Sequence, residues 1–124
     1  AMVVHGADGM DEISISGPTR VWELADGKVR THTITPEEVG LPSSPLDSIK
    51  GGSLEHHKEM FLSVLQGVPG PAQDVVALNA AAALVLGGKA RDLKEGIALA
   101  KKAIASGAAH KKLEDLASLS QKLS

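Results

Sequence analysis

Two adjacent carboxylates, Asp11 and Glu12, follow a glycine-containing turn at the end of the apolar segment Met2–His5. Adjacent acidic side chains on an irregular backbone can bind one hard cation, either directly or through its waters. Magnesium fits such a pair best, because substrate phosphates can complete its coordination and few protein ligands are needed. The same spacing also describes an exposed acidic turn, and spacing alone favours this second interpretation.

Other patterns that could carry chemistry give weaker signals. The glycines of segment 6–9 (Gly-Ala-Asp-Gly) would let backbone amides approach a phosphate, but the third glycine and the helix start of a dinucleotide fingerprint are missing. Segment 50–53 (Lys-Gly-Gly-Ser) lacks the first glycine and the residue order of a P-loop. His56 and His57 are neighbours on a predicted helix and point about 100° apart, so we expect surface histidines rather than a shared metal site. No spacing of Ser, His and Asp resembles a nucleophile elbow, and we assign no catalytic residue.

Two polar residues lie inside apolar segments. His5 ends a predicted strand at the place where open α/β sheets bind ligands, although a packed, hydrogen-bonded histidine is the favoured interpretation. Asn79 interrupts the apolar run 75–86, and a buried amide must find hydrogen-bond partners. We therefore expect Asn79 to make a structural hydrogen bond to a neighbouring loop or strand.

The composition bounds the possible classes of protein. With 124 residues the chain can form one domain, or most of one, around a single core. A net charge of −2 gives no basic field for nucleic acid or an anionic membrane, and Trp22 and Phe61 alone cannot form a stacking platform. Cysteine is absent, which excludes disulfides and thiolate sites and is consistent with a cytoplasmic protein. The longest apolar run is too short to span a bilayer, and the first residues lack a signal-peptide pattern.

The chain divides into a strand-rich part (1–40), a loop (41–52) and a helical part (53–124). Four segments carry β-branched residues typical of strands: Met2–His5, Glu12–Ser16, Arg20–Leu24 and Val29–Ile34. Asp26-Gly27 predicts a hairpin between the last two strands. Thr35 and Glu38 predict a capping box for a short helix that ends at Gly40. A strand at the very start, with nothing before it to pair with, also suggests that the chain begins inside a larger domain.

Caps and periodicity predict four further helices. They begin after Ser53, at Pro71, after Asp92 and near residue 108. The apolar stretch Val75–Leu86 should be buried on all sides of its helix. The third helix should turn Leu93, Ile97, Ala100 and Ile104 inward, and the fourth Leu113, Leu116, Leu123 and Ala117 or Leu119. Four lysines should form solvated outward faces: Lys101, Lys102, Lys111 and Lys112.

Three segments together resemble the C-terminal part of the α/β domain of bacterial anthranilate phosphoribosyltransferases. They are residues 3–14 (VVHGADGMDEIS), residues 17–21 (GPTRV) and residues 74–84 (DVVALNAAAAL). Residues 36–41 (PEEVGL) add to the likeness, which runs over almost the whole chain. It implies an α/β fold in which a partial mixed β-sheet with a β-hairpin is flanked by about four α-helices, all within one domain portion spanning residues 1–124.

Enzymes of that family transfer the phosphoribosyl group of phosphoribosyl pyrophosphate to anthranilate in tryptophan biosynthesis. The resemblance implies that Asp11 and Glu12 bind the magnesium associated with that substrate. It also implies a homodimer formed through an N-terminal helical domain, which these residues lack.

The family's Gly-Thr-Gly-Gly-Asp loop, its Lys-His-Gly-Asn-Arg segment and its anthranilate-side arginine are also absent. We therefore expect this chain alone to be inactive. The alternatives are a non-catalytic module of the same fold, binding nucleic acid or completed by oligomerisation, and a nucleoside phosphorylase. The charge disfavours nucleic acid, and the pattern of residues 9–14 disfavours the phosphorylase.

Overall fold

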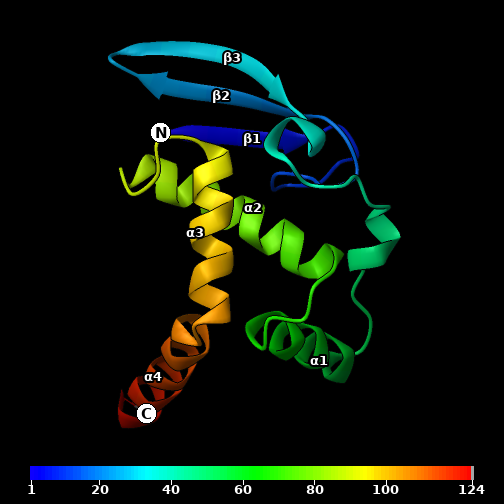
Figure 1. The fold of residues 1–124 in the computed structure, drawn as a ribbon, viewed down its shortest axis with the longest axis vertical. Coiled ribbons are helices and arrows are strands. Elements are labelled where there is room, and N and C mark those ends of the chain that lie inside the picture. The colour runs from blue at the N-terminus through cyan, green and yellow to red at the C-terminus, as the bar shows by residue number, and fades with distance from the viewer. Residues whose placement is uncertain (124) are drawn as a thin grey trace.

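The computed structural model describes residues 1–123, and its N-terminal part is a three-stranded antiparallel sheet (Figure 1). Strands β1 (Met2–Gly6), β2 (Thr19–Ala25) and β3 (Lys28–Ile34) lie in the order β1-β2-β3. The α/β fold class is confirmed. Among the described residues both strand pairings are antiparallel.

The β2–β3 hairpin forms as the Asp26-Gly27 pair predicts. Asp26 and Gly27 have φ angles of 51° and 72°. Positive φ at both central residues is the type I′ geometry, whose twist matches that of the flanking strands. The turn fixes the register, in which Ala25 faces Lys28 and Thr19 faces Ile34.

The predicted strand Glu12–Ser16 is wrong, because this segment is a loop that joins β1 to β2. Ile13 and Ile15 are both buried, as alternate residues of a strand would be. Their backbone, however, is satisfied by side chains and by other loops instead of a strand ladder. Asn79 binds the Ile13 backbone, and the Ile15 carbonyl accepts from the Ser44 amide. The alternating β-branched residues of this segment therefore belong to a loop that packs against the core.

Two short 3-10 helices, η1 (Glu37–Val39) and η2 (Leu46–Ile49), lie between the sheet and the helical part. The capping box is present, since the Thr35 amide donates to Glu38 Oε2 at 2.9 Å and the Glu38 amide to Thr35 Oγ1 at 3.4 Å. Gly40 ends this turn with a φ of 85°.

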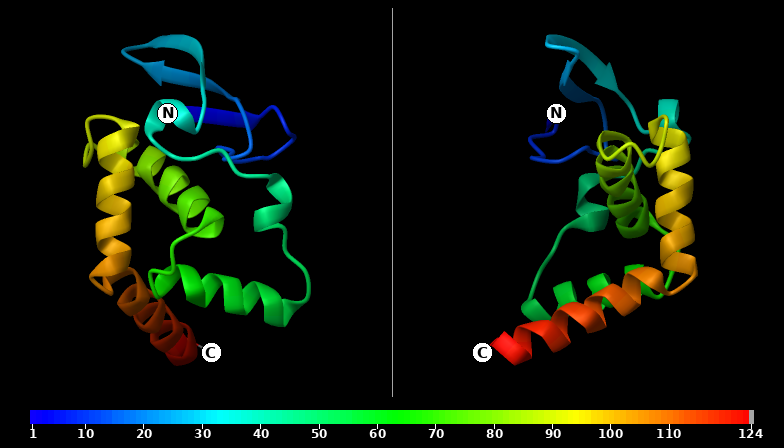
Figure 2. Two further views of the ribbon diagram at one scale, coloured as in Figure 1. Left: turned by 45° about the vertical axis from the view of Figure 1, so that its right-hand side comes forward. Right: turned by 90° about the vertical axis from the view of Figure 1, so that its left-hand side faces the viewer.

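The helical part consists of α1 (Leu54–Leu65), α2 (Pro71–Leu86), α3 (Leu93–Ala105) and α4 (Ala108–Leu123). The predicted caps form, because the side chains of Ser53 and Asp92 accept hydrogen bonds from the first turns of α1 and α3. Helix α2 lies next to the sheet and crosses α3, whereas α1 and α4 lie at the end of the molecule away from the sheet (Figures 1 and 2). None of the described helices is long and apolar enough to cross a bilayer.

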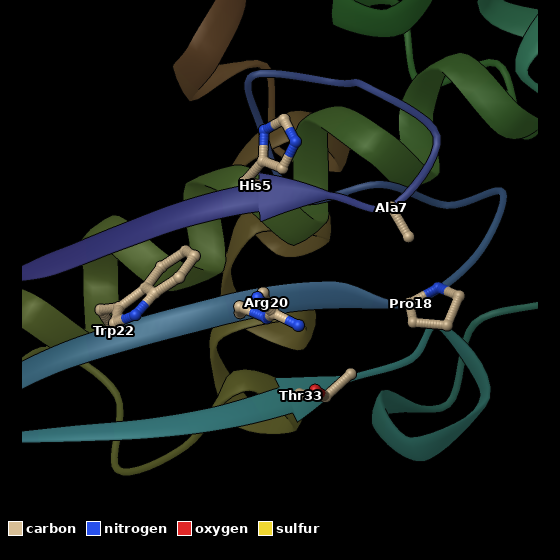
Figure 3. A pocket seen from close by; sticks show the side chains of 6 residues that line it. All are labelled: His5, Ala7, Pro18, Arg20, Trp22 and Thr33. Atoms are coloured by element: carbon tan, nitrogen blue, oxygen red, sulfur yellow. The ribbon is translucent and has the colours of Figure 1, made fainter.

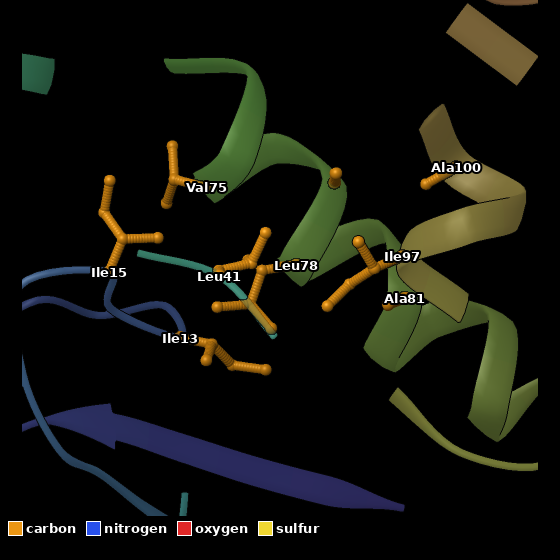
Figure 4. Close-up of a cluster of buried hydrophobic side chains, with 9 residues drawn as sticks. Ile13, Ile15, Leu41, Val75, Leu78, Ala81, Ile97 and Ala100 are labelled. Atoms are coloured by element: carbon orange, nitrogen blue, oxygen red, sulfur yellow. The ribbon is translucent and has the colours of Figure 1, made fainter. Parts of the chain in front are cut away.

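The hydrophobic core lies between the β1–β2 loop, α2 and α3 (Figure 4). Helices α2 and α3 approach closely at Gly96, where an added Cβ would lie 2.7 Å from the Ala81 Cβ. The buried members of the core cluster come from these three elements and from the segment after η1. They are Ile13, Ile15, Leu41, Val75, Ala77, Leu78, Ala81, Ile97 and Ala100.

Three expectations about the helices are wrong. Helix α2 is not buried on all sides, because Val76 and Leu86 are about half exposed at 47% and 48%. No residue of α4 is buried, and Leu116, expected inside, is 62% exposed. Lys101 is not merely solvated, since its Nζ lies 2.7 Å from Oδ1 of the buried Asp74. The apolar periodicity of α2 and α4 therefore identifies the apolar side of each helix, and the described residues of this chain leave part of that side uncovered.

Candidate metal site at the end of strand β1

Asp11 and Glu12 lie in the β1–β2 loop, five and six residues after β1 ends at Gly6, and both are exposed. Within residues 1–123 neither carboxylate makes a hydrogen bond or an ion pair. Carboxylate oxygens without an internal partner are available to a hard cation. A simple exposed acidic turn would have the same exposure. Only the backbone on either side of the pair can therefore separate that interpretation from a metal site.

The residue before the pair, Met10, is anchored to the end of β1. Its carbonyl accepts a hydrogen bond from the Gly6 amide at 2.9 Å, and its amide donates to Asp8 Oδ1 at 3.0 Å. Gly9, with a φ of 92°, makes the turn between these contacts. The loop therefore reaches Asp11 from a fixed position.

The residue after the pair, Ile13, is anchored to helix α2. Its amide donates to Asn79 Oδ1 and its carbonyl accepts from Asn79 Nδ2, both at 2.9 Å. Asn79 Nδ2 also donates to the carbonyl of Val75, within the same helix. The predicted structural hydrogen bond of Asn79 to a loop is thus confirmed.

Asp8 connects the exposed start of the loop with its buried end. Its Oδ2 accepts a hydrogen bond from Ser14 Oγ at 2.5 Å and another from Ser16 Oγ. Slight burial raises the pKa of Asp8, but the hydrogen bonds from Ser14, Ser16 and the amides of Met10 and Asp8 itself outweigh this effect. The net pKa lies below the ordinary value of 3.8.

The donor set fits magnesium only with help from other ligands. Among the described residues no group of three or more His, Asp or Glu side chains is placed to hold a metal. Two exposed carboxylates supply hard oxygen ligands, and magnesium commonly keeps waters and substrate phosphates in its remaining positions. The pair therefore fits a substrate-associated magnesium and does not form a closed protein cage.

The predicted packed role of His5 is wrong. His5 is exposed on the outer face of the sheet, opposite Arg20 in the β1–β2 pairing. Both line a shallow pocket of about 310 Å³ with Ala7, Pro18, Trp22 and Thr33 (Figure 3). The Arg20 guanidinium carbon lies 5.8 Å from the centre of the Trp22 ring. His56 and His57 are exposed on α1, as expected of surface histidines.

A sequence model described as the glycosyl transferase family, a/b domain, matches residues 1–110. The chain belongs to this glycosyl transferase family. Anthranilate phosphoribosyltransferase of Rhodopseudomonas palustris strain HaA2 is 53% identical over 118 residues, which are 95% of this chain and 35% of that protein. The enzyme of Nitrosomonas eutropha is 46% identical over 99% of this chain and 36% of its own length. The predicted resemblance to anthranilate phosphoribosyltransferases is confirmed, and the chain spans about a third of the length of these relatives.

Solved structures of the glycosyl transferase family share the fold. The crystal structure of anthranilate phosphoribosyltransferase from Thermus thermophilus superposes with a TM-score of 0.83 at 43% identity, over 93% of this chain and 34% of the other. The Saccharomyces cerevisiae enzyme in complex with PRPP and Mg superposes with a TM-score of 0.80 at 30% identity, over 91% and 33%. The fold of this chain is therefore that of one part of these larger enzymes.

Sequence reasoning missed the hydrogen bonds of Asp8 with Ser14 and Ser16 in this family member. An Asp at the start of a turn commonly accepts a hydrogen bond from the backbone amide two residues later. The order Asp8-Gly9-Met10 therefore indicates the bond from the Met10 amide to Asp8. The serine bonds had no such signal, because the segment 12–16 was predicted to be a strand. In an extended strand, Ser14 and Ser16 would share one face and would not turn back towards Asp8.

Proposed function

We propose that the chain is the C-terminal portion of the α/β domain of an anthranilate phosphoribosyltransferase. The enzyme would transfer the phosphoribosyl group of phosphoribosyl pyrophosphate to anthranilate, in tryptophan biosynthesis. The likeness to relatives of that name, over nearly the whole chain, supports this substrate class. The homodimer and the cytoplasmic location expected from the sequence stay predictions.

Within this enzyme, Asp11 and Glu12 would hold the magnesium that accompanies phosphoribosyl pyrophosphate. The observation that carries this assignment is the exposed, unpartnered pair at the carboxyl end of β1, held between two anchored residues within the described part of the chain. The yeast relative in complex with PRPP and Mg supports magnesium as the cation.

A bound magnesium ion would neutralise charge that grows on pyrophosphate as the glycosidic carbon–oxygen bond breaks. The chain's own contribution is to present two carboxylates in a fixed direction, and no described residue is assigned an acid or base role. The 124 residues would thus supply one corner of a larger active site.

A chimeric enzyme tests the proposed function. This chain would replace the matching third of the Rhodopseudomonas palustris enzyme, and the loss of anthranilate fluorescence would report the transfer. We expect magnesium-dependent activity, and a strong loss when Asp11→Asn is combined with Glu12→Gln. The control Asp115→Asn removes an exposed carboxylate on α4 and should leave activity unchanged.

An inactive but folded chimera would contradict the enzyme assignment and favour the non-catalytic interaction module. One observation favours that second function: a mainly apolar groove of about 710 Å³ lies between α1, α2, α3 and the start of α4. An active chimera whose magnesium dependence survives the Asp11–Glu12 double substitution would remove only the metal assignment.

A further inference from the structure

Asp11 and Glu12 form a short arc of the β1–β2 loop, and the two ends of this arc are fixed by different parts of the fold. Met10 is held by Gly6 and Asp8 on one side of the pair, and Ile13 by Asn79 on the other. Only two residues lie between these anchors. A two-residue arc with both ends fixed has little freedom, so the anchors determine where the carboxylates point.

We propose that Asp8 is the positioning residue of the Asp11–Glu12 metal site. Its carboxylate ties the amide of Met10, before the pair, to the hydroxyls of Ser14 and Ser16, after the pair. This role rests on the proposed function above and adds to it a residue that would act through the loop and not on the metal.

The contacts of Asp8 separate it from the metal ligands. Oδ1 accepts the Met10 amide, and Oδ2 accepts both serine hydroxyls, so both oxygens are engaged inside the loop. Gly6 leaves room for this arrangement, because a Cβ added there would collide with Asp8 Oδ1. The side chains of Asp11 and Glu12, by contrast, have no such partners within residues 1–123.

The far end of the Asp8 contacts is rigid. Ser14 is 1% exposed, and its amide donates to Oγ1 of the fully buried Thr19 at 3.0 Å. Ser14 Oγ also accepts from the Ser16 amide at 2.9 Å. Asp8 therefore connects the exposed acidic arc to backbone that is fixed by β2.

The test compares Asp8→Ala with Asp8→Asn in the full 124-residue chain. Asparagine removes the charge but keeps an oxygen for the Met10 amide and two N–H groups for the two serine hydroxyls. Alanine removes the charge and all the contacts. Asp115→Ala is the matched control, because it removes an exposed aspartate on α4, far along the chain from this loop.

Two quantities are measured. Manganese(II) binding by electron paramagnetic resonance reports the carboxylate pair, and amide hydrogen exchange of residues 9–14 in the metal-free chain reports the loop. Loss of a residue that orients metal ligands typically weakens affinity by about 10-fold or more, and we expect this of Asp8→Ala. We expect Asp115→Ala to keep both the affinity and the exchange protection of the unaltered chain, and Asp8→Asn to lose much less of each than Asp8→Ala does.

Equal weakening in Asp8→Ala and Asp8→Asn would overturn the proposal, because the lost charge and not the lost contacts would then control the metal. Unchanged exchange protection in Asp8→Ala would overturn it as well. If the unaltered chain binds no manganese without substrate phosphates, the metal assignment of the proposed function is decided by the chimeric enzyme alone. The positioning of the loop by Asp8 is then decided by exchange alone, with selective loss of protection in Asp8→Ala supporting it.

Discussion

Asn79 and Ile13 are 66 residues apart in the sequence and share two hydrogen bonds of 2.9 Å, one to the Ile13 amide and one to its carbonyl. A side-chain amide matches a backbone peptide group in this way because it carries both a donor and an acceptor. Helix α2 is thereby joined to the loop that presents Asp11 and Glu12, at the place where a strand ladder would otherwise satisfy the backbone.

Asn79→Ala should destabilise the fold markedly. The amide and carbonyl of Ile13 would both lose their partners next to the core, and each unsatisfied buried group costs roughly 1–3 kcal/mol. We expect the free energy of unfolding in urea to fall by about 2–4 kcal/mol. Gln121→Ala, an amide removed from the exposed surface of α4, is the control and should have little effect. Equal stability of the Asn79 and Gln121 variants would show that the Ile13 contacts contribute nothing.

Gly96→Ala should also destabilise, although alanine is the better helix former. The gain in helix propensity is about 1 kcal/mol. The new Cβ, however, would lie 2.7 Å from the Ala81 Cβ and 2.8 Å from its Cα, and overpacking of this kind costs about 1–3 kcal/mol. We expect a lower melting temperature by calorimetry. Gly52→Ala is the control, since its Cβ would meet nothing closer than 3.6 Å. A higher melting temperature for Gly96→Ala would mean that α2 and α3 can separate at no cost.

Local signals in the sequence predicted most of the elements, because each signal acts within the short segment that carries it. The hairpin at Asp26-Gly27, the capping box of Thr35 and the caps Ser53 and Asp92 all form as expected. Each depends on contacts within about four residues, which a single sequence displays directly.

Long-range relationships were less accessible. The pattern of residues 12–16 fits a strand as well as a loop. The contacts that satisfy its backbone come from distant parts of the chain, from Asn79 on α2 to Ile13 and from Ser44 to Ile15. The apolar periods of α2 and α4 predicted buried faces, but Val76 and Leu116 stay exposed because periodicity says which side is apolar and not what covers it. For the candidate site, the acidic pair was found from its residue types, whereas the Asp8 contacts that hold the loop required the chain reversal to be known.

Acidification should remove a stabilising contribution of Asp8. Because hydrogen bonds in the folded chain lower the pKa of Asp8, its charged form stabilises the fold above the ordinary value of 3.8, and this contribution is lost as the pH falls towards the lower folded pKa. Between about pH 5 and pH 3 the free energy of unfolding should therefore fall more steeply for the unaltered chain than for Asp8→Asn. Urea unfolding at several pH values measures both slopes. Parallel curves for the two chains would mean that the Asp8 carboxylate gains nothing from its hydrogen bonds.

Helix α4 should make the isolated chain associate. Leu116, Leu119 and Leu123 are 62%, 54% and 79% exposed and recur at helical spacing, so they form an apolar stripe along one side. Covering such a stripe gains roughly 25 cal/mol for each Å² of apolar area removed from water, which favours contact between copies at high concentration.

Sedimentation velocity over a range of concentrations would measure this association. Leu116→Lys combined with Leu119→Lys should shift the chain towards monomer, because lysine at both positions interrupts the stripe and adds mutual repulsion. Ala117→Lys with Ser118→Lys adds the same charge to exposed positions of the same helix and leaves the leucines in place. Equal dissociation by the two double variants would assign the effect to charge. A monomeric unaltered chain at every concentration would show that an apolar stripe of this size is too small to drive assembly without further covered surface.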